Sequence, residues 1–436
     1  MKVLVVGKGA REHAILKKIH EQRPEVTLYA TPGNPGIAQI AKCVPIEAMD
    51  VDGLVEFAMR EQIDLTIVGP EGPLGAGIKD RFSEEGLVLF GPSLLAAQIE
   101  HNKEFSASLM NWYQIPTGWH KVFYTPEKVL AFARKQGYPL VIKNPFPASG
   151  KGAFVCFNQP QADFALGKIQ EQQTGRSGDF HFFVMEYLKG TEVSIMAVAN
   201  GTHVVYLSSS EDHKRLLDGD EGPMTGGMGA IAPSPFITPE IQAEIHEKII
   251  LRTLKAMEAE VRPYSGVLYA GLMLTPEGPK IIEFNCRFGD PETQAILPLL
   301  EHDLLDILWV ASVGGLQHIK IPEPRRAAAC TVLTAKNYGY GRPETGKVII
   351  GLRHLEQISD VNVFHAGTRL SDDGYNLETA DGRVVSVVGL ADDLPTAIIR
   401  SSQAADGIYF DGVHRRRDIG HKALTYLKEK EGGKTS

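Results

Sequence analysis

The chain has 436 residues, of which 43% are hydrophobic and 22% are charged, and its formal net charge is -8 with a pI near 6.0. This composition is typical of a folded globular protein and argues against disordered and membrane-embedded classes. The acidic balance argues against a nucleic-acid-binding surface, which needs a basic stripe. The length predicts two to four domains. Because the first residues are apolar only as far as Val6, we expect a cytoplasmic protein.

The first hundred residues alternate short apolar runs with helical patterns. Strands and helices are predicted in turn at 3–6, 11–20, 26–30, 53–62, 65–68, 75–85 and 88–90. Short strands separated by single helices indicate a doubly wound parallel sheet. Such sheets bind ligands at the carboxyl ends of their strands. The turn-rich segments 7–13, 31–36 and 69–73 are therefore predicted to line one pocket.

The rest of the chain predicts three more units. One helix is expected over 93–113, ended by proline in 114–118. A lid-sized α+β unit follows, with strands at 140–143, 153–157 and 182–187 and helices at 127–135 and 162–170. A larger region has strands near 192–199, 204–208, 266–275 and 280–285. A proline-marked linker at 317–324 leads into a β-rich domain with strands at 329–334, 347–350 and 384–388.

These boundaries give a multidomain α/β and α+β chain. The expected division is an N-terminal domain at 1–102, a central domain at 103–121 and 189–326, a lid at 122–188, a C-terminal domain at 327–427 and a polar tail at 428–436. The four cysteines are widely scattered without a CxxC pair, so we expect reduced thiols rather than disulfides or a zinc site.

Two glycine-rich loops are candidates for phosphate binding, each with a plainer alternative. Gly7 and Gly9 follow a strand, but Glu12 replaces the third glycine of the dinucleotide fingerprint, so a tight turn explains them equally well. The SGKG run at 149–152 is not a Walker A motif, because Pro145 stands where that motif needs glycine. It remains either a hairpin turn or a loop that folds over a polyphosphate.

A third glycine-rich run, TGGMG at 225–229, follows the charged segment 211–215. Mixed charges beside glycines suggest an anionic ligand. The acidic residues between the two segments are assigned instead to a solvated surface loop: Asp218, Asp220 and Glu221.

The segment 281–287 carries the most specific pattern. Glu283 and Asn285 alternate with apolar residues, so both oxygen-bearing side chains point to one face of a strand. Mg²⁺ binds through one or two such oxygens and keeps positions for phosphates. Arg287 continues on the same face, where it could stabilise phosphoryl charge. The alternative is an ion pair at the end of a strand.

Nine motifs together carry a resemblance to a known family. They are GKGAREH at 7–13, PGN at 32–34, IVGPEGPL at 67–74, DHKR at 212–215, TGGMGA at 225–230, YSGVLYAGLM at 264–273, IEFNCRFGDPETQ at 282–294, VFHAGT at 363–368 and RRRDIG at 415–420. The chain resembles the phosphoribosylamine-glycine ligases, also called glycinamide ribonucleotide synthetases, of the ATP-grasp superfamily. The resemblance covers nearly the whole chain and implies an ATP-grasp fold.

The resemblance implies ATP-dependent ligation of glycine to 5-phosphoribosylamine in de novo purine biosynthesis. An acyl phosphate would form first, and ADP and phosphate would be released. The implied cofactors are ATP as co-substrate and Mg²⁺, or Mn²⁺ in its place. The partners are then small molecules, with no nucleic acid or membrane, and we expect a monomer or weak dimer.

The resemblance also implies a site, residue by residue. ATP would contact Lys103, Lys143, Ser149, Gly150, Lys151, Gly152, Glu186, Tyr187, Leu188 and Glu192. The metal would bind Glu283 and Asn285, and the catalytic residues would be Arg287, Lys214 and Asp212. The other substrates would contact Gly9, Asn34, Glu71, Thr225, Gly226, Gly227 and Asp290.

Three departures from the family pattern leave two other functions open. Lys8 and Ala10 replace Asn and Gly, Met224 replaces Asn, and the run at 145–148 replaces Asp-Gly-Leu-Ala before the glycine loop. The first two changes favour a ligase for another amine or amino acid. The prolines at 145–148, which stiffen the loop, favour a nucleotide-binding paralogue without turnover.

Overall fold

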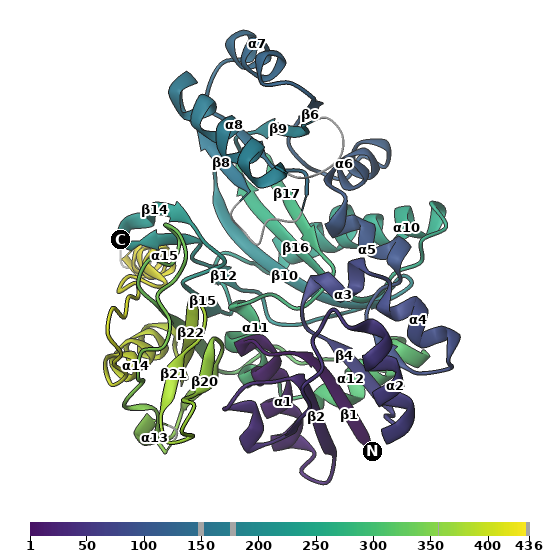
Figure 1. Cartoon of the computed structure of the whole chain (residues 1–436). Coiled ribbons are helices and arrows are strands. Elements are labelled where there is room, and N and C mark those ends of the chain that lie inside the picture. The colour runs from purple at the N-terminus through teal and green to yellow at the C-terminus, as the bar shows by residue number, and fades with distance from the viewer. Residues whose placement is uncertain (147–151, 175–179, 356, 433–436) are drawn as a thin grey trace.

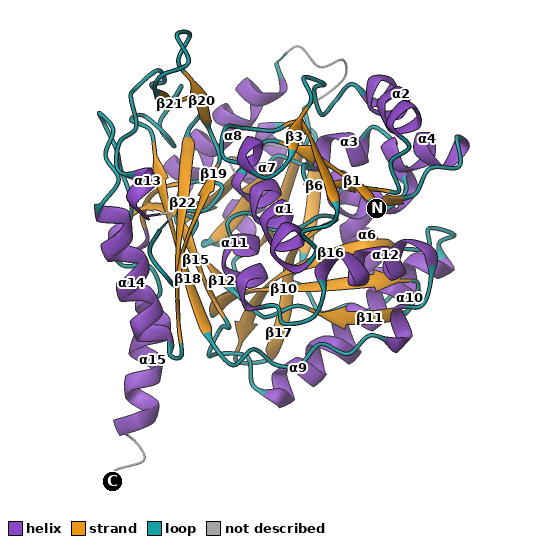
Figure 2. Cartoon of the chain, turned by 90° about the horizontal axis from the view of Figure 1, so that it is seen from below, coloured by secondary structure: helices purple, strands orange, loops and turns teal. Residues whose placement is uncertain are grey.

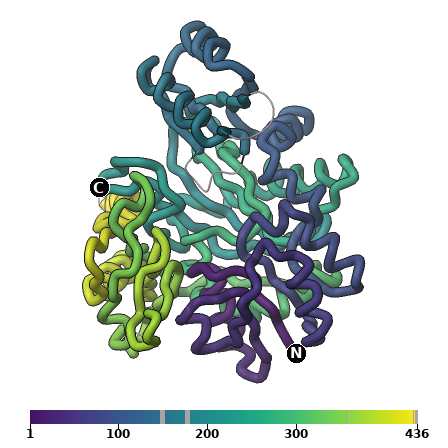
Figure 3. Tube along the Cα trace, viewed as in Figure 1, coloured from purple at the N-terminus to yellow at the C-terminus, as the bar shows by residue number. Residues whose placement is uncertain are grey.

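The structure is a computed structural model that describes residues 1–146, 152–174, 180–355 and 357–432. A central antiparallel sheet lies in the middle of Figure 1, with the lid above it. The first domain and the last domain lie side by side below, as the chain trace in Figure 3 also shows.

The N-terminal domain is the predicted doubly wound sheet. Its five strands are all parallel, in the order β3-β2-β1-β4-β5. The strands are β1 (Lys2–Gly7), β2 (Thr27–Pro32), β3 (Lys42–Cys43), β4 (Leu65–Val68) and β5 (Leu89–Phe90), and the helices are α1 (Ala10–Gln22), α2 (Val51–Glu61), α3 (Glu71–Gly75) and α4 (Ile78–Glu84). The strand order reverses between β1 and β4. At this switch point the carboxyl ends of the two strands open toward the central sheet, as expected for a ligand-binding edge.

The single helix predicted over 93–113 is wrong in one respect, because the structure has two helices there. These are α5 (Leu94–His101) and α6 (Lys103–Trp112). Asn102 between them has an extended backbone, and its side-chain oxygen accepts from the Phe105 amide at 3.0 Å. Asparagine is a preferred N-cap, so it starts a new helix. The break places Lys103 at the first helical position.

The lid is a separate unit with its own core. Its antiparallel sheet has the order β6-β9-β7-β8 and is covered by two helices. The elements are β6 (His120–Phe123), β7 (Leu140–Lys143), β8 (Ala153–Cys156), β9 (Phe182–Glu186), α7 (Pro126–Gln136) and α8 (Gln159–Gln173). Among the described residues, its buried cluster contains only side chains from within 129–184, such as Val129, Ile142 and Phe182. The predicted strands and helices of this unit are confirmed.

The central sheet is antiparallel, in the order β11-β10-β16-β17. Its strands are β10 (Thr191–Asn200), β11 (His203–Tyr206), β16 (Ser265–Thr275) and β17 (Gly278–Asn285). The helices of this region are α9 (Pro239–Ile245), α10 (Leu251–Ala259), α11 (Glu292–Ile296) and α12 (Leu304–Val313). The predicted strands are confirmed, each within two or three residues at its ends.

The C-terminal sheet contains strands from two regions of the chain. Its order is β12-β15-β18-β22-β19. The strands are β12 (Glu211–Asp212), β15 (Gly229–Ala232), β18 (Ala327–Thr334), β19 (Val361–His365) and β22 (Arg383–Ala391), and a separate pair is β20 (Thr368–Leu370) with β21 (Leu377–Thr379). Because β12 and β15 belong to the central region in sequence, the two domains share one sheet. A hairpin of β13 (Arg215–Leu217) and β14 (Glu221–Met224) projects from its edge.

Two predictions for this part of the chain are wrong. The strand expected at 347–350 forms only isolated bridges, and its apolar side chains Val348 and Ile350 are exposed rather than packed on a sheet. The expected tail at 428–436 is helical as far as Gly432, because α15 (His421–Gly432) continues through it. Figure 2 shows α14 (Leu394–Asp406) along the sheet and α15 extending from the body.

One continuous hydrophobic cluster joins the first, central and last domains. It includes Val5 of β1, Val198 of β10 and Phe364 of β19, all nearly or fully buried. The lid, by contrast, meets the body through a small cluster in which Phe183 and Met185 pack against Ala107 of α6. The body is therefore one packed unit, and the lid is attached to it by few apolar contacts. In the described part of the chain, no helix has the length and apolar character needed to cross a membrane.

The cysteines give a first test of the packing. All four thiols are free as predicted; Cys43 is exposed, and Cys156, Cys286 and Cys330 are buried. We expect a thiol reagent such as Ellman's reagent to modify Cys43 alone in the native protein and all four cysteines after unfolding. A Cys43→Ser variant should show no rapid native reaction. Rapid native labelling of that variant would contradict the packing described here.

Candidate active site

The main cavity lies between the lid, the central sheet and the N-terminal domain, and it has a volume of about 480 Å³. The lid contributes mostly apolar side chains, including Val141, Phe183 and Met185. The central region contributes mostly polar and charged groups. The sequence-predicted residues that line the cavity are Glu71, Lys103, Lys143, Gly152, Glu186, Tyr187, Leu188, Glu192, Asp212, Lys214, Thr225, Gly226, Glu283, Asn285, Arg287 and Asp290.

Lys214 lies at the centre of the charged wall. Its ammonium group donates to Glu192 Oε1 at 2.5 Å and to Glu283 Oε1 at 3.3 Å. Burial opposes the charged form of Lys214, but the two carboxylates outweigh it and raise the pKa of Lys214 well above its usual range. In return, Lys214 lowers the pKa of Glu283 to about 2 against the opposing effect of burial. Lys214 and Glu283 therefore stay charged at neutral pH.

Two further lysines enter the cavity from different elements. The Lys143 ammonium, at the end of β7, donates to the Ile282 carbonyl at 3.3 Å. The Lys103 ammonium, at the start of α6, lies 3.5 and 3.4 Å from the carbonyl oxygens of Pro145 and Phe146. Burial lowers the pKa of Lys103 to about 8, and the nearby Lys143 adds to the decrease. Neither ammonium has a carboxylate partner within salt-bridge distance among the described residues, so both favour an anionic ligand.

The predicted metal ligands fit a hard divalent cation. Glu283 and Asn285 lie at alternate positions of β17, opposite Gly271 and Tyr269 of β16, and both line the cavity. An ionised carboxylate and an amide oxygen are suitable ligands for Mg²⁺, which takes few protein ligands and keeps the remainder for phosphates and water. The Asn285 oxygen already accepts from Arg287 Nη2 at 3.3 Å. The donor set suits magnesium better than a soft metal.

Arg287 joins this wall to the N-terminal domain. Its Nε lies 3.4 Å from Glu71 Oε2, and its Nη2 lies 3.4 Å from Glu100 Oε1. Burial would raise the pKa of Glu71, but Arg287 and Arg11 outweigh it and the pKa is lowered. The guanidinium group is thus held by two carboxylates beside the predicted metal ligands.

The wall next to Lys214 is made by two loops packed in close contact. Gly227 has φ +112, and a Cβ there would lie 2.4 Å from Pro291 Cδ and 2.7 Å from Asp212 Oδ1. Only glycine allows this approach. Asp212 Oδ1 is buried and has no hydrogen-bond partner among the residues that the structure describes. Burial raises the pKa of Asp212 well above its usual value, and Glu292 adds to the increase.

The sequence did not predict Arg383, which the C-terminal domain contributes to this wall from the start of β22. Its Nη1 donates to the carbonyl oxygens of Gly226 and Asp290, both at 2.8 Å, and its Nη2 lies 3.1 Å from Asp290 Oδ2. It therefore ties the two loops together. No local motif marks Arg383, because its partners are 157 and 93 residues away in the chain.

Some predicted residues are not brought to the cavity. Asn34 is buried, and its amide nitrogen donates to the Lys8 and His365 carbonyls at 2.8 and 2.9 Å, so it holds the first and last domains together. The Gly9 amide donates to Glu12 at 2.6 Å, outside the cavity lining. Gly227 packs closely against Pro291 and Asp212 but does not itself line the cavity. Ser149, Gly150 and Lys151 lie outside the described residues.

Comparison with known proteins decides the family. Models of phosphoribosylglycinamide synthetase match the chain as the N domain at 1–100, the ATP-grasp (A) domain at 101–293 and the C domain at 328–422. The chain belongs to the phosphoribosylamine-glycine ligase family. The ligase of Caldanaerobacter subterraneus subsp. tengcongensis is 43% identical over 96% of this chain and 99% of its own length. That of Ralstonia nicotianae is 42% identical over 97% and 100%.

Solved structures agree with this assignment. The phosphoribosylamine-glycine ligase of Thermotoga maritima matches with a TM-score of 0.81 and 30% identity, over 96% of this chain and 100% of that chain. A biotin carboxylase domain of Hydrogenobacter thermophilus, solved with MgADP, ADP and bicarbonate, matches with a TM-score of 0.72 at 17% identity, over 95% and 91%. The latter likeness shows the fold alone. The predicted ATP-grasp fold and the class of ATP-dependent ligase are confirmed.

Arg383 gives a test of the shared wall. In an Arg383→Met variant, we expect kcat/KM for the substrates other than ATP to fall by roughly a hundredfold, because the loops at Gly226 and Asp290 lose their common donor. ATP affinity should be unchanged, because the hydrogen bonds and the ion pair of Arg383 within the described residues go to Gly226 and Asp290 and not to the lid. An Arg369→Met variant, which changes an exposed arginine paired with Glu378 on β21, is the control. Wild-type kinetics in Arg383→Met would contradict this role.

Proposed function

We propose that the chain ligates glycine to 5-phosphoribosylamine at the expense of ATP, as its family relatives are named for doing. The observation that carries the proposal is the set of charged groups in the cavity, with Lys214 between Glu192 and Glu283 and with Lys103 and Lys143 close to Glu283. Such a wall can neutralise a polyphosphate while a carboxylate attacks it. The apolar surface of the lid, on the other side of the cavity, is suited to pack against the nucleotide base.

The first step joins two anions. A carboxylate oxygen of glycine attacks the γ-phosphorus of ATP, the bond to the β-phosphate oxygen breaks, and glycyl phosphate and ADP form. Lys103 and Lys143 lower the repulsion between the two anions because each brings a positive charge without a paired carboxylate. When bound at Glu283 and Asn285, Mg²⁺ would neutralise phosphate charge in the same place. Mn²⁺ as a substitute stays a prediction.

The second step forms the amide bond. The amine of phosphoribosylamine attacks the carbonyl carbon of glycyl phosphate, phosphate leaves, and the nitrogen loses a proton. Asp212 is proposed to accept that proton, because its Oδ1 is buried in the wall and has no hydrogen-bond partner among the described residues. Asp290, Thr225 and Gly226 form the wall beside it and are proposed to bind the amine substrate.

Adenine is proposed to bind the strand end that leads out of the lid. Glu186, Tyr187 and Leu188 line the cavity there, and the Glu186 carboxylate is fixed by the Trp119 amide at 3.2 Å. A lid that covers the acyl phosphate excludes water, which would otherwise hydrolyse it. The proposed division into a lid at 122–188 and a body agrees with the separate lid core.

One observation favours a second candidate, a ligase for a different amine or amino acid. Met224, which replaces the asparagine of the family pattern, lines the cavity directly before Thr225. A thioether there removes an amide that could donate to a substrate. The oligomeric state, expected to be a monomer or weak dimer, stays a prediction.

The co-substrate requirement tests the function. We expect ADP release from MgATP only when glycine and phosphoribosylamine are both present, because glycyl phosphate is consumed only by the amine. ADP release that ignores phosphoribosylamine would overturn the proposal. Release with another amino acid in place of glycine would support the second candidate.

Glu283 is both a proposed metal ligand and a hydrogen-bond partner of Lys214. A Glu283→Gln variant should lose roughly a hundredfold or more in kcat, because it removes one metal ligand and one partner of the Lys214 ammonium. Glu277→Gln, an exposed change just before β17, is the matched control. Steady-state turnover of both variants decides whether the effect belongs to the site.

Lys103 predicts proton uptake on ATP binding. Its pKa of about 8 leaves Lys103 largely neutral at pH 8.5 in the free protein. Phosphates favour the ammonium form, so ATP binding should take up protons at pH 8.5, and ATP affinity should fall as the pH rises through this pKa. Calorimetric titrations in two buffers of different ionisation enthalpy measure the uptake.

A Lys103→Met variant should lose that uptake, whereas Lys128→Met, an exposed change on α7, should retain it. Equal uptake in wild-type protein and Lys103→Met would contradict the assignment of Lys103 to the phosphates.

A further inference from the structure

Both ends of the hairpin of β13 and β14 lie at the main cavity, which we call the cleft. Lys214 lies directly before β13, and Met224 at the end of β14 is followed by Thr225. The amide and the hydroxyl of Thr225 both donate to the Lys214 carbonyl, at 2.8 and 2.9 Å, and close the base of the hairpin. A displacement of the hairpin therefore moves Lys214 and the neighbouring wall together.

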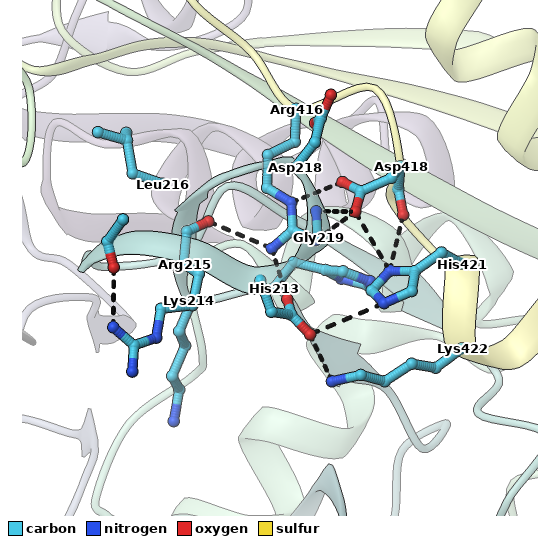
Figure 4. A network of polar contacts seen from close by, with 12 residues as sticks. His213, Lys214, Arg215, Leu216, Asp218, Gly219, Arg416, Asp418, His421 and Lys422 are labelled. Carbon is cyan, nitrogen blue, oxygen red and sulfur yellow. Dashed lines mark hydrogen bonds and ion pairs between the residues drawn. The ribbon is translucent and has the colours of Figure 1, made fainter. Parts of the chain in front are cut away.

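The tip of the hairpin, residues 218–220, is bound by the segment 416–422, which contains part of the RRRDIG motif (Figure 4). Four contacts of 2.5 to 2.8 Å join them: Asp218 to the Arg417 amide, the Gly219 amide to Asp418, and Asp220 to Arg416 and to Lys422. Asp218 is exposed, as predicted for a solvated loop, and Asp220 is half-buried. Both are also bonded to a segment about 200 positions later in the chain, which the sequence did not predict. Glu221 is exposed as expected.

Arg416 is the centre of this network, and its side chain is fully buried. Nε and Nη2 donate to the two oxygens of Asp418 at 2.8 and 2.9 Å. Nη1 donates to Asp220 Oδ1 at 2.8 Å and to the Arg215 carbonyl at 3.2 Å. Arg215 directly follows Lys214. The buried guanidinium thus holds the tip of the hairpin and the backbone beside the central lysine at once.

Two histidines hold the same stretch of backbone. His213 Nε2 accepts from the Gly420 amide at 2.9 Å, and His414 Nε2 donates to the Leu216 carbonyl at 3.0 Å. His213 precedes Lys214, so residues on both sides of the lysine are fixed by the C-terminal segment. Figure 4 shows Lys214 pointing away from this network, and Lys214 lines the cleft.

We propose that Arg416 is a positioning residue for the ligation reaction. By fixing the hairpin, it places the ammonium group of Lys214 between Glu192 and Glu283. The inference rests on the proposed function of the cleft. Arg416 does not line the cavity, whereas the residues proposed to bind adenine come from the lid end at 186–188 and share none of these contacts. Loss of Arg416 should therefore lower turnover much more than ATP affinity.

The test uses the full-length protein and three variants. Arg416→Lys keeps a buried cation but cannot reproduce the fork of four hydrogen bonds. Asp220→Asn removes the carboxylate charge that Arg416 contacts at the tip of the hairpin. Because Asp220 is half-exposed, this variant tests the same contact if Arg416→Lys does not fold. Arg417→Lys makes the same chemical change at an exposed neighbour whose contact to Asp218 comes from its backbone, and it is the matched control.

We expect kcat to fall about tenfold or more in Arg416→Lys and Asp220→Asn, with the ATP dissociation constant changed by less than about twofold. Hydrogen exchange of the amides at 213–217 should become faster in both variants. Arg417→Lys should match the wild type. A folded Arg416→Lys variant with wild-type kcat, or kcat and ATP affinity falling together, would overturn the inference.

The two proposals can fail separately. A wild-type protein that shows no ligation of glycine would overturn the proposed function. Hydrogen exchange at 213–217 would still report whether Arg416 holds the hairpin, and unchanged exchange in Arg416→Lys would overturn the positioning role.

Discussion

The site depends on how Lys214 balances two carboxylates in a largely buried wall. Without this ammonium group, Glu192 and Glu283 would lose the cation that contacts both of them. With it, Glu283 stays ionised and remains a suitable metal ligand. The unpaired charges of Lys103 and Lys143 are then available to a nucleotide rather than consumed by the protein. The arrangement is costly without a ligand and favourable with one, as expected for a site organised around phosphoryl transfer.

The C-terminal domain contributes a few residues to this site. Strands β12 and β15 of the central region join its sheet, so Asp212 lies on the edge strand of a sheet whose other three strands, β18, β22 and β19, belong to the last domain. Arg383 reaches the cleft from that sheet. Arg416 does not line the cleft, but its guanidinium group binds the Arg215 carbonyl beside Lys214. Asn34 adds a contact from the N-terminal domain to His365. The body therefore acts as one unit against which a weakly attached lid can close.

The correct predictions concern features that depend on residues close together in the chain. The parallel sheet followed from alternating runs, and the alternation at 282–285 placed Glu283 and Asn285 in one cavity with Arg287. The break at Asn102 was missed because capping competes with a helical pattern that continues on both sides. Arg383 and Arg416 could not be found by local spacing, since their partners lie far away in the chain. The run at 347–350 was wrongly predicted as a strand because an apolar composition does not show whether the backbone pairs with a neighbour: Ile349 is buried, but Val348 and Ile350 are exposed and form only isolated bridges.

Transfer of oxygen from glycine to phosphate tests the proposed chemistry most directly. Glycine labelled with ¹⁸O in both carboxylate oxygens would be incubated with the protein, MgATP and phosphoribosylamine, and the released phosphate would be analysed by mass spectrometry. Formation of glycyl phosphate followed by attack of the amine at carbon leaves one labelled oxygen in each phosphate. Product formation with unlabelled phosphate would contradict an acyl phosphate and, with it, the role assigned to the charged wall.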